Sequence, residues 1–250
     1  MNLISPNLNI MIKACEKASK IIIRDFGEIE NLQVLKKGPR DFVTKTDKRA
    51  EKILMEELQK ARKNYSFITE ESGVINNSDK DCFWIIDPID GTTNFLHGIP
   101  HFAISVALKI NGEIKSGIIF DPIKNEMFYA EKNSGSFFNN RRIRVSKKND
   151  LDECLFASNN EGLNHVFPNL NMRYSGCASL DLAYVGCGRL DGFFHNKINI
   201  WDIAAGVLIV EEAGGKVNNL NKYKDNDENI NVRASNSNIY TKMLKILDNF

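Results

Sequence analysis

The first quarter of the chain carries two runs of apolar residues at helical spacing. The first run covers residues 7–26 and is followed by Gly27, and the second covers about 48–62. Apolar side chains at every third or fourth position line one face of a helix, and a glycine commonly ends it. The pattern therefore predicts two amphipathic helices. Thr46 or Asp47 is suited to cap the second one, because short polar side chains bond the first free amides.

Much of the remaining chain consists of short apolar runs, some alternating with polar residues, between turn signals, as strands do. Asn111-Gly112 separates two such runs and predicts a hairpin, whereas the polar stretch 72–81 predicts a loop. Helical patterns return at residues 180–189, 201–213 and 238–247. The predicted strands cover residues 65–69, 83–86, 102–110, 113–120, 126–130, 136–145, 155–158, 173–175, 192–195, 216–219 and 231–235.

A charged, polar segment at residues 146–152 separates two halves with different patterns. Before it, two helices precede a run of hairpin-connected strands, which predicts a largely antiparallel sheet. After it, short strands alternate with helices. We expect one compact unit built from an N-terminal half, residues 1–146, and a C-terminal half, residues 147–250, that completes the site.

The composition is that of an ordinary globular protein of 250 residues, with 42% hydrophobic and 26% charged residues. A formal net charge of +1 gives no reason to expect a nucleic-acid or acidic-membrane partner. Five scattered cysteines without a Cys-x-x-Cys pair argue against a disulfide framework or a zinc site and favour a reducing cytoplasm. No stretch approaches the roughly 20 apolar residues of a membrane span, and the N-terminus lacks the apolar core of a signal peptide.

The strongest chemical signal follows the apolar run Phe83–Ile86, which predicts a buried strand. Pro88 cannot donate to a ladder, so we expect pairing to stop near Asp87. Asp87 and Asp90 then provide two carboxylates at the end of a strand, and Gly91 allows backbone amides to approach an anion. A single aspartate here would be a turn former, but two hard oxygen ligands beside a phosphate cradle are suited to a magnesium–phosphate site.

The stretch from Phe83 through Asp87-Pro88-Ile89-Asp90-Gly91-Thr92-Thr93 to Phe95 resembles the signature of the inositol monophosphatase family, whose members are magnesium-dependent, lithium-sensitive phosphatases. Further fragments extend the resemblance over nearly the whole chain. They are residues 41–47, residues 67–72, and the pair formed by residues 201–206 and 212–215. Thr69 departs from the glycine that the family usually has before its two glutamates, at a position that need not touch the ligands.

The resemblance implies an α/β (α+β) fold, a layered αβαβα sandwich of the sugar-phosphatase type. It also implies a site for two or three Mg²⁺ ions, with Asp87 bridging two of them. The implied ligands are Glu70, Asp87, Asp90, Asp202 and the backbone carbonyl of Ile89. Without the resemblance, Asp202 would be a favourable acid in the first turn of a helix, and we expect Glu211 and Glu212 to be ordinary solvated charges.

The same resemblance assigns the catalytic roles. Thr92 would accept a hydrogen bond from the attacking water and donate one to Asp47, so that the two act as a base relay. The implied substrate contacts are Asp90, Gly91, Thr92, Ala178 and His195, with the amides of Gly91 and Thr92 on the phosphate oxygens. His195 stands six residues before the signature tryptophan, where many inositol-hydrolysing relatives have a glutamate, and a neutral histidine both donates and accepts.

The implied reaction is hydrolysis of inositol monophosphate (myo-inositol 1-phosphate), or of a related small polyol or sugar phosphate, by direct attack of water. We expect the enzyme to be a cytoplasmic homodimer. Fructose 1,6-bisphosphate, histidinol phosphate and a 3'-phosphonucleotide stay open as substrates. Two other classes stay open as well, a non-catalytic regulatory partner of RNA synthesis and a glycosidase using Asp87 and Asp90 as an acid/base pair, although a glycosidase has no use for the Gly-Thr-Thr cradle.

Two other clusters of polar residues have weaker interpretations. His97 and His101 have the spacing of metal ligands on a helix, but Gly98 and Pro100 lie between them and argue against a helix there. The basic run from Arg141 to Lys148 predicts either a solvated turn or an RNA contact.

Overall fold

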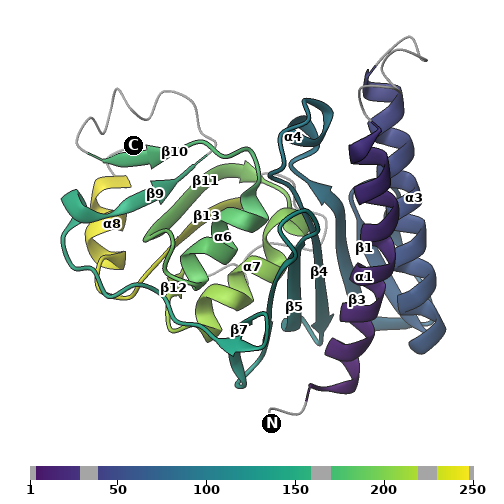
Figure 1. Cartoon of the computed structure of the whole chain (residues 1–250). Helices are drawn as coiled ribbons and strands as arrows, with labels where there is room; N and C mark the ends of the chain where they lie inside the picture. Colours follow the sequence, from purple (N-terminus) through teal and green to yellow (C-terminus); the bar gives the residue numbers. More distant parts are fainter. Residues whose placement is uncertain (1–3, 29–38, 159–169, 219–229, 248–250) are drawn as a thin grey trace.

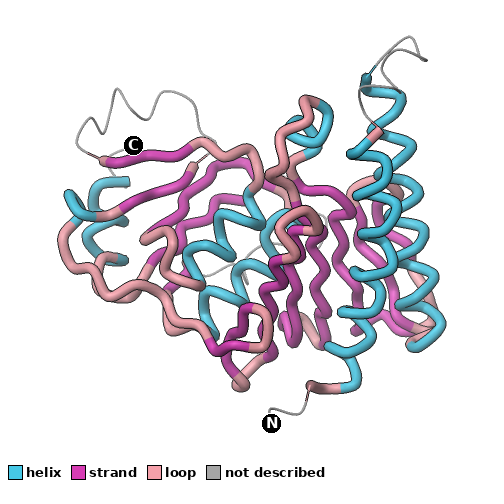
Figure 2. Tube along the Cα trace, in the orientation of Figure 1, coloured by secondary structure: helices cyan, strands magenta, loops and turns pink. Residues whose placement is uncertain are grey.

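The chain folds into five alternating layers of helices and sheets (Figure 1). The computed structural model describes residues 4–28, 39–158, 170–218 and 230–247. An outer pair of helices, α1 (Pro6–Gly27) and α3 (Pro39–Ala61), is followed by the first sheet, a middle layer of helices, the second sheet and α8 (Tyr240–Leu247). The layer order, which Figure 2 also shows, is the αβαβα sandwich that the family resemblance predicts.

The two outer helices run antiparallel against one face of the first sheet. Arg62, just past α3, donates to Asn7 at the start of α1 (2.6 Å), while Thr46 of α3 donates to Asp25 near the end of α1 (2.9 Å). Their inner faces pack into the core with the sheet. The buried side chains of the two helices include Leu8, Met11, Cys15, Ile22, Leu54 and Leu58.

The second helix starts earlier than the sequence predicts. α3 begins at Pro39 rather than near residue 48, and proline is well tolerated in a first helical turn because it lacks the amide hydrogen that would stay unpaired there. Asp47 therefore lies within the helix and does not cap it.

The first sheet has eight strands in the order β2-β1-β3-β4-β5-β6-β7-β8. All neighbours are antiparallel except β1 and β3. The predicted hairpin over Asn111-Gly112 is confirmed, with positive φ angles of 51° and 80°. The strands are β1 (Tyr65–Thr69), β2 (Gly73–Ile75), β3 (Asp79–Asp90), β4 (Ala103–Ile110), β5 (Glu113–Asp121), β6 (Glu126–Glu131), β7 (Gly135–Phe138) and β8 (Arg141–Arg142).

Two predictions for this sheet are wrong. The polar stretch 72–81 is not a loop, because β2 pairs with β1 across a short turn and β3 already starts at Asp79. The predicted strand 136–145 is two strands, since Asn139 and Asn140 turn the chain with φ angles of 43° and 67°. Asparagine adopts this left-handed conformation more readily than most residues, so the asparagine pair was an overlooked turn signal.

β3 continues past its predicted stop near Asp87 to Asp90, by means of a bulge. Asp87 is paired with Ser105 and Asp90 with Ala103, so two residues of β3, Pro88 and Ile89, oppose a single residue of β4. A bulge leaves a residue out of the ladder and bends the strand, and Pro88 has no amide hydrogen to leave unpaired there. The bulge lies between the two aspartates and so sets their relative orientation.

The middle layer consists of α6 (Ala178–Gly186) and α7 (Ile200–Glu212), which pack against both sheets. Leu208 of α7 shares a buried cluster with Ile85 of the first sheet. On its other side, α7 packs with residues of the second sheet. The contact with the first sheet is very close, because a Cβ atom on Gly117 of β5 would lie 2.9 Å from the Cα atom of Ala205. The two halves of the chain therefore share one interior.

The second sheet has five strands in the order β10-β9-β11-β13-β12. Its outer face is covered by α8, whose Met243 and Leu247 share a buried cluster with Phe156 and Phe194. The short helix η1 (Leu151–Glu153) leads into the sheet from the first half. The strands are β9 (Leu155–Ala157), β10 (Asn171–Arg173), β11 (Gly192–Ile198), β12 (Lys216–Val217) and β13 (Ile230–Ser235).

The segment between β8 and β9 contains the predicted boundary at residue 146 and most of the basic run. Its Lys148 is bound to the buried carboxylate of Asp191 (2.9 Å), which also accepts hydrogen bonds from Ser146 and from the amide of Leu155. One end of the basic run thus forms an ion pair that holds the segment between β8 and β9 against the second sheet. In the described parts of the chain, no helix combines the length and apolar character that crossing a membrane requires.

Candidate active site

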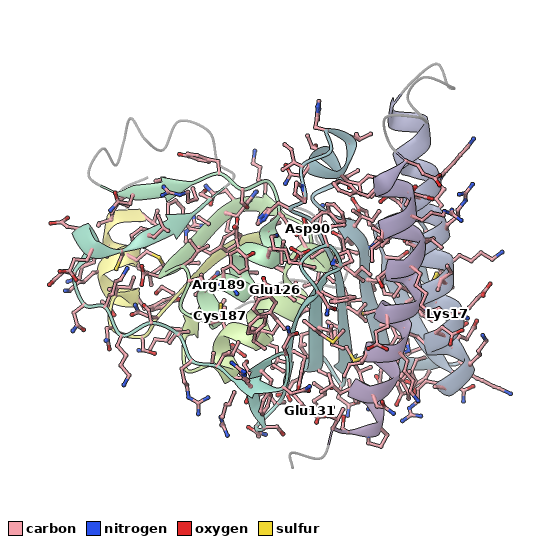
Figure 3. The ribbon with its side chains drawn as sticks, in the orientation of Figure 1. Lys17, Asp90, Glu126, Glu131, Cys187 and Arg189 are labelled. Carbon is pink, nitrogen blue, oxygen red and sulfur yellow. The ribbon has the colours of Figure 1, made fainter. Side chains whose placement is uncertain are left out.

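Three carboxylates from two different layers meet beside the end of β3. Asp87 and Asp90 come from β3, and Asp202 comes from the first turn of α7. One oxygen atom of each lies within 4.8 Å of the others, and this is the metal-compatible grouping that the described residues form. Asp90 lies where the middle helices meet the first sheet (Figure 3). The structure thus brings together residues that are more than a hundred positions apart.

Backbone amides orient all three carboxylates. Oδ1 of Asp87 accepts a hydrogen bond from the amide of Ile89 (2.9 Å), and Oδ2 of Asp202 accepts one from the amide of Asn199 (3.1 Å). Oδ2 of Asp90 accepts one from the amide of Ser179 (2.6 Å). In each case one carboxylate oxygen is oriented by a backbone amide.

Asp90 links the first sheet to the start of α6. Besides the amide of Ser179, its Oδ2 contacts the Cys177 thiol at 3.2 Å. Asn94 strengthens the same junction, because its side-chain amide donates to the carbonyl of Ser175 (2.9 Å). Ala178, a predicted substrate contact, is the first residue of α6 and stands in the chain between Cys177 and Ser179, the two residues that contact Asp90.

Glu70 stands at the end of β1, beside Asp87. β1 is parallel to β3, and the amide of Glu70 donates to the carbonyl of Ile86, the residue before Asp87 (3.2 Å). The turn that follows is held by Glu51 of α3, whose carboxylate accepts hydrogen bonds from the amide of Glu71 (3.0 Å) and from the Ser72 hydroxyl. Glu51 is buried, and through these bonds it holds the turn that follows Glu70.

Thr92 and Asp47 are not joined by the hydrogen bond that the resemblance implies. The Thr92 hydroxyl donates to the carbonyl of Ile89 (2.9 Å), the same carbonyl that is predicted to bind a metal. Asp47 is 2% exposed, and its Oδ1 has no hydrogen-bond partner among the described residues. An unpartnered buried carboxylate oxygen is costly, which indicates that this group is arranged to meet a ligand or water.

Burial, and after it the neighbouring like charges, raise the pKa values of the carboxyl groups in the site. Burial, followed by the charges of Glu70, Asp90 and Asp202, raises the pKa of Asp87 well above its ordinary value. Burial also raises the pKa of Asp202 to about 8 and that of Asp47 to about 8. Glu70 is exposed as a residue, yet removal of its carboxyl group from water raises its pKa to about 7.

The carboxylate cluster fits divalent cations on its own chemistry. Hard oxygen ligands that converge from several directions suit Mg²⁺, and a bound cation would offset the repulsion that raises these pKa values. His97 and His101 do not belong to the metal-compatible group in the described part of the chain, and the His101 ring packs edge-on against Tyr184. The carboxylates, not the histidines, are therefore the candidate ligands.

Gly91 provides the tight turn between β3 and α4 (Thr92–Leu96). Its φ is 92°, in the left-handed region, and an added Cβ atom would meet the His101 carbonyl at 3.0 Å and the Cys177 Cβ at 3.3 Å. Glycine is therefore required here both by conformation and by space. The backbone around Gly91 is packed from both halves of the chain.

His195 lies on β11, the strand before α7. Its Nδ1 bonds the carbonyl of Asn196 at 2.8 Å, and burial lowers its pKa, so the ring is neutral near physiological pH. In this pairing Nδ1 carries the hydrogen and Nε2 is left as an acceptor. None of the described hydrogen bonds joins His195 to the three aspartates.

Sequence reasoning missed several residues that hold the site. Ser179, Cys177 and Glu51 each bond a predicted ligand or its turn, but nothing in the sequence pairs them with residues 20 to 89 positions away. The expectation for Glu212 is wrong, because its carboxylate accepts hydrogen bonds from the amides of Asn133 and Gly135, both at 2.8 Å. It joins α7 to the turn between β6 and β7.

The fold and the carboxylate site are those of a known family. The model of the inositol monophosphatase family matches residues 4–249, and the chain belongs to this family. It is 48% identical over 221 residues to an inositol-1-monophosphatase of Rhizobium meliloti (strain 1021), covering 83% of each chain. It is 38% identical over 252 residues to the Nus factor SuhB of Escherichia coli (strain K12), covering 96% of this chain and 94% of the other.

Solved structures agree with this assignment. The native crystal structure of the extragenic suppressor protein suhB from Bartonella henselae is similar with a TM-score of 0.86 and 43% sequence identity, over 97% of this chain and 98% of the other. The sandwich architecture of this chain is thus the one found experimentally in a related protein.

Proposed function

We propose that this chain is a magnesium-dependent phosphomonoesterase that hydrolyses inositol monophosphate or a related small polyol or sugar phosphate. The observation that carries the proposal is the convergence of Asp87, Asp90 and Asp202 within 4.8 Å. Family membership supports the class of reaction, and the name inositol-1-monophosphatase carried by relatives supports the substrate. Small polyol phosphates are compatible with a site built largely from oxygen ligands and backbone amides.

The metal would be held by the three aspartates together with Glu70 and the carbonyl of Ile89. Two or three Mg²⁺ ions, when bound, would polarise the phosphoryl oxygens and make the attacking water more acidic. Thr92 is oriented by its bond to Ile89, which leaves its oxygen free to accept a hydrogen bond from that water. The open Oδ1 of Asp47 would accept a proton from the same water once a bound cation offsets the neighbouring charges that help to raise the pKa of Asp47.

The turn after β3 would bind the phosphate group. The amides of Gly91 and Thr92 begin a helix, where amides have no partner within the helix, and donors of this kind stabilise developing negative charge. Asp90 and Ala178 would contact the alcohol part of the substrate. His195 would present Nε2 as an acceptor, which is the same hydrogen-bonding role that a glutamate plays.

A phosphate-release assay tests this proposal. Wild-type protein should release phosphate from myo-inositol 1-phosphate with magnesium and not with a chelator, and fructose 1,6-bisphosphate, histidinol phosphate and a 3'-phosphonucleotide complete the panel. No release from any ester would reject the enzyme and favour a binding role.

His195→Glu should leave the ranking of esters unchanged if Nε2 acts as an acceptor, and a reordered ranking would contradict that role. Lithium inhibition and the homodimer stay predictions from the resemblance.

A further inference from the structure

The outer face of the α1–α3 layer is strongly basic. The exposed charged side chains of α1 are four bases and a single acid, Glu16, and among the described side chains of α3, from Lys45 on, the exposed charged ones are also mostly basic, with Glu56 as the exposed acid. Figure 3 shows Lys17 on this layer, apart from Asp90. We call this surface the basic helical face, and it consists of Lys13, Lys17, Lys20, Arg24, Lys45, Lys48, Arg49, Lys52 and Lys60.

The bases of α1 form a straight line. Lys13, Lys17, Lys20 and Arg24 are separated by four, three and four residues, a spacing that places side chains on one face of a helix. At a rise of about 1.5 Å per residue the line is roughly 16 Å long, with a positive charge every 5–6 Å or so. The bases of α3 form a second line beside it, since the two helices run antiparallel and Lys17 and Lys60 bind the same carboxylate of Glu57, each at 2.6 Å.

Acidic residues of the two helices neutralise only part of this charge. Glu57 is shared by Lys17 and Lys60, and the buried Asp25 lies beside Arg24 (2.6 Å) and Arg49 (3.7 Å). Within the described parts of the chain, four of the lysines have no ion-pair partner within 4 Å. They are Lys13, Lys20, Lys45 and Lys48. The net charge of +1 for the whole chain therefore conceals a surface on which positive charge is concentrated.

We propose that the basic helical face binds nucleic acid through the phosphodiester backbone, without selecting bases. Regularly spaced lysines act as point charges toward phosphates, and release of the counterions of the nucleic acid drives such binding. The net charge of +1 gave no reason to expect a nucleic-acid partner, because it averages bases and acids over the whole chain. Folding changes that conclusion by gathering bases from two distant stretches on one face.

Two other anionic partners fit this face less well. Protein interfaces are depleted of lysine and enriched in aromatic residues, and none of the described aromatic side chains of α1 and α3 is exposed. Membrane-surface helices expose a wide apolar face, whereas Ile23 is the exposed large hydrophobic residue on the described side chains of these helices. The apolar sides of both helices are already buried against the first sheet.

Fluorescence anisotropy with labelled RNA and DNA, single-stranded and duplex, tests the proposal. The test variant is Lys13→Glu/Lys20→Glu/Lys52→Glu, and the control is Arg141→Glu/Arg144→Glu/Lys147→Glu, which has the same charge change within the basic run that the sequence offered as an RNA contact. We expect wild type and the control to bind with an affinity that falls between about 50 and 200 mM salt. The test variant should lose at least about tenfold in affinity, and its logarithmic salt slope should fall by roughly two to three.

Phosphate release and thermal unfolding should be unchanged in the test variant, which shows that the fold and the carboxylate site are intact. Lys13→Gln/Lys20→Gln/Lys52→Gln should also lose affinity for nucleic acid. Because this variant adds no acidic groups, its loss of affinity excludes an effect of new negative charge. The proposal is overturned if wild type binds no nucleic acid at the lowest salt, or if the control loses binding and the test variant keeps it. Binding only to vesicles that contain phosphatidylserine would overturn it in favour of a membrane surface.

Discussion

Asp87, Asp90 and Asp202 are each held in a similar way. One oxygen accepts a hydrogen bond from a backbone amide, donated by Ile89, Ser179 and Asn199 respectively, and this fixes the carboxylate plane. An asparagine could keep such a bond through its own carbonyl oxygen, but it would carry no negative charge. Substitution by asparagine can therefore separate the effect of the negative charge from the effect of the side-chain geometry.

Asp202→Asn should abolish most phosphate release while the protein stays folded. The reason is that the variant keeps a partner for the amide of Asn199 but removes one of the three converging charges. Magnesium affinity, measured by titration calorimetry, should fall by at least about tenfold. Asp152→Asn, at an exposed position, is the matched control and should behave as wild type. Normal turnover in Asp202→Asn would refute its assignment as a ligand.

Thr92→Ala should lower turnover more than metal binding. The hydroxyl is held by the Ile89 carbonyl and is proposed to orient water, and loss of such a group typically costs about 10²-fold or more in rate. Thr92→Ser keeps the hydroxyl and should recover most of the activity. Turnover measured across magnesium concentrations separates the two effects. A variant with weaker magnesium binding and unchanged turnover at saturation would contradict the role.

At the scale of elements, the turn after β3 is tightly constrained by its own conformation and by its neighbours. The bulge at Pro88 and Ile89 rotates the strand end, and Gly91 then brings the chain close to His101 and Cys177. The sequence predicted that Gly91 would allow a close approach, but its prediction that pairing would stop near Asp87 is wrong. It could not predict that the strand would resume at Asp90, because that depends on the partner strand β4.

Gly91→Ala should reduce both stability and activity. The added methyl group must adopt a φ of 92° and would meet the His101 carbonyl at 3.0 Å, which we expect to cost roughly 3 kcal/mol or more. Gly98→Ala is the matched control, since Gly98 has a φ of 69° but no atom within 4 Å of an added Cβ. Its cost should be only about 1–2 kcal/mol, with activity retained. Equal losses in chemical denaturation would show that contact at Gly91 is unimportant.

Glu212→Gln should destabilise the fold without changing catalysis. Both carboxylate oxygens accept backbone hydrogen bonds, from Asn133 and Gly135, and a glutamine can accept only one of them. The expected loss is about 1–2 kcal/mol in denaturant unfolding. The neighbouring Glu211→Gln breaks an exposed contact with Lys132 at 3.6 Å and should cost less than about 0.5 kcal/mol. A larger loss in Glu211→Gln than in Glu212→Gln would contradict this account.

What the sequence predicted well has a local cause. The helices follow from apolar spacing, the Asn111-Gly112 hairpin from turn chemistry, and the acidic group at Asp87 from its strand, proline and glycine. What it missed depends on partners brought in by folding. β2 is too polar to be identified without β1 beside it, and Ser179 has no reason to bond Asp90 until α6 packs against the first sheet. The proposed roles of Asp47 and Asp202 came from the family resemblance, because each is an ordinary helix residue by itself.

At the scale of the whole molecule, the carboxylates make stability depend on pH and on metal. The folded-state pKa values of Asp47 and Asp202 are raised to about 8 and that of Glu70 to about 7, from ordinary values of 3.8 and 4.5. The folded protein therefore binds more protons than the unfolded chain between about pH 4 and 8. It follows that these groups lower the free energy of unfolding of the metal-free protein as the pH rises through this window.

Thermal unfolding in a chelator should therefore give a lower Tm at pH 8 than at pH 5. Magnesium should raise the Tm more at pH 8, since it binds the ionised carboxylates of the folded state. The double variant Asp47→Asn/Asp202→Asn should show a smaller difference between the two pH values. An equal magnesium effect at both pH values, or a metal-free protein that is more stable at pH 8, would contradict the argument.

The division of the carboxylates between β3 and α7 has a consequence for how the protein is made. A ribosome delivers Asp87 and Asp90 well before Asp202, and at about 5–20 residues per second the interval is roughly 6–22 seconds. During that time the nascent chain has only part of its cation site, and Asp90 still lacks the amide of Ser179 that orients it. An incomplete or prematurely terminated product would therefore be unable to act on cellular phosphate esters, and hydrolysis would begin only once the middle helices have packed onto the first sheet.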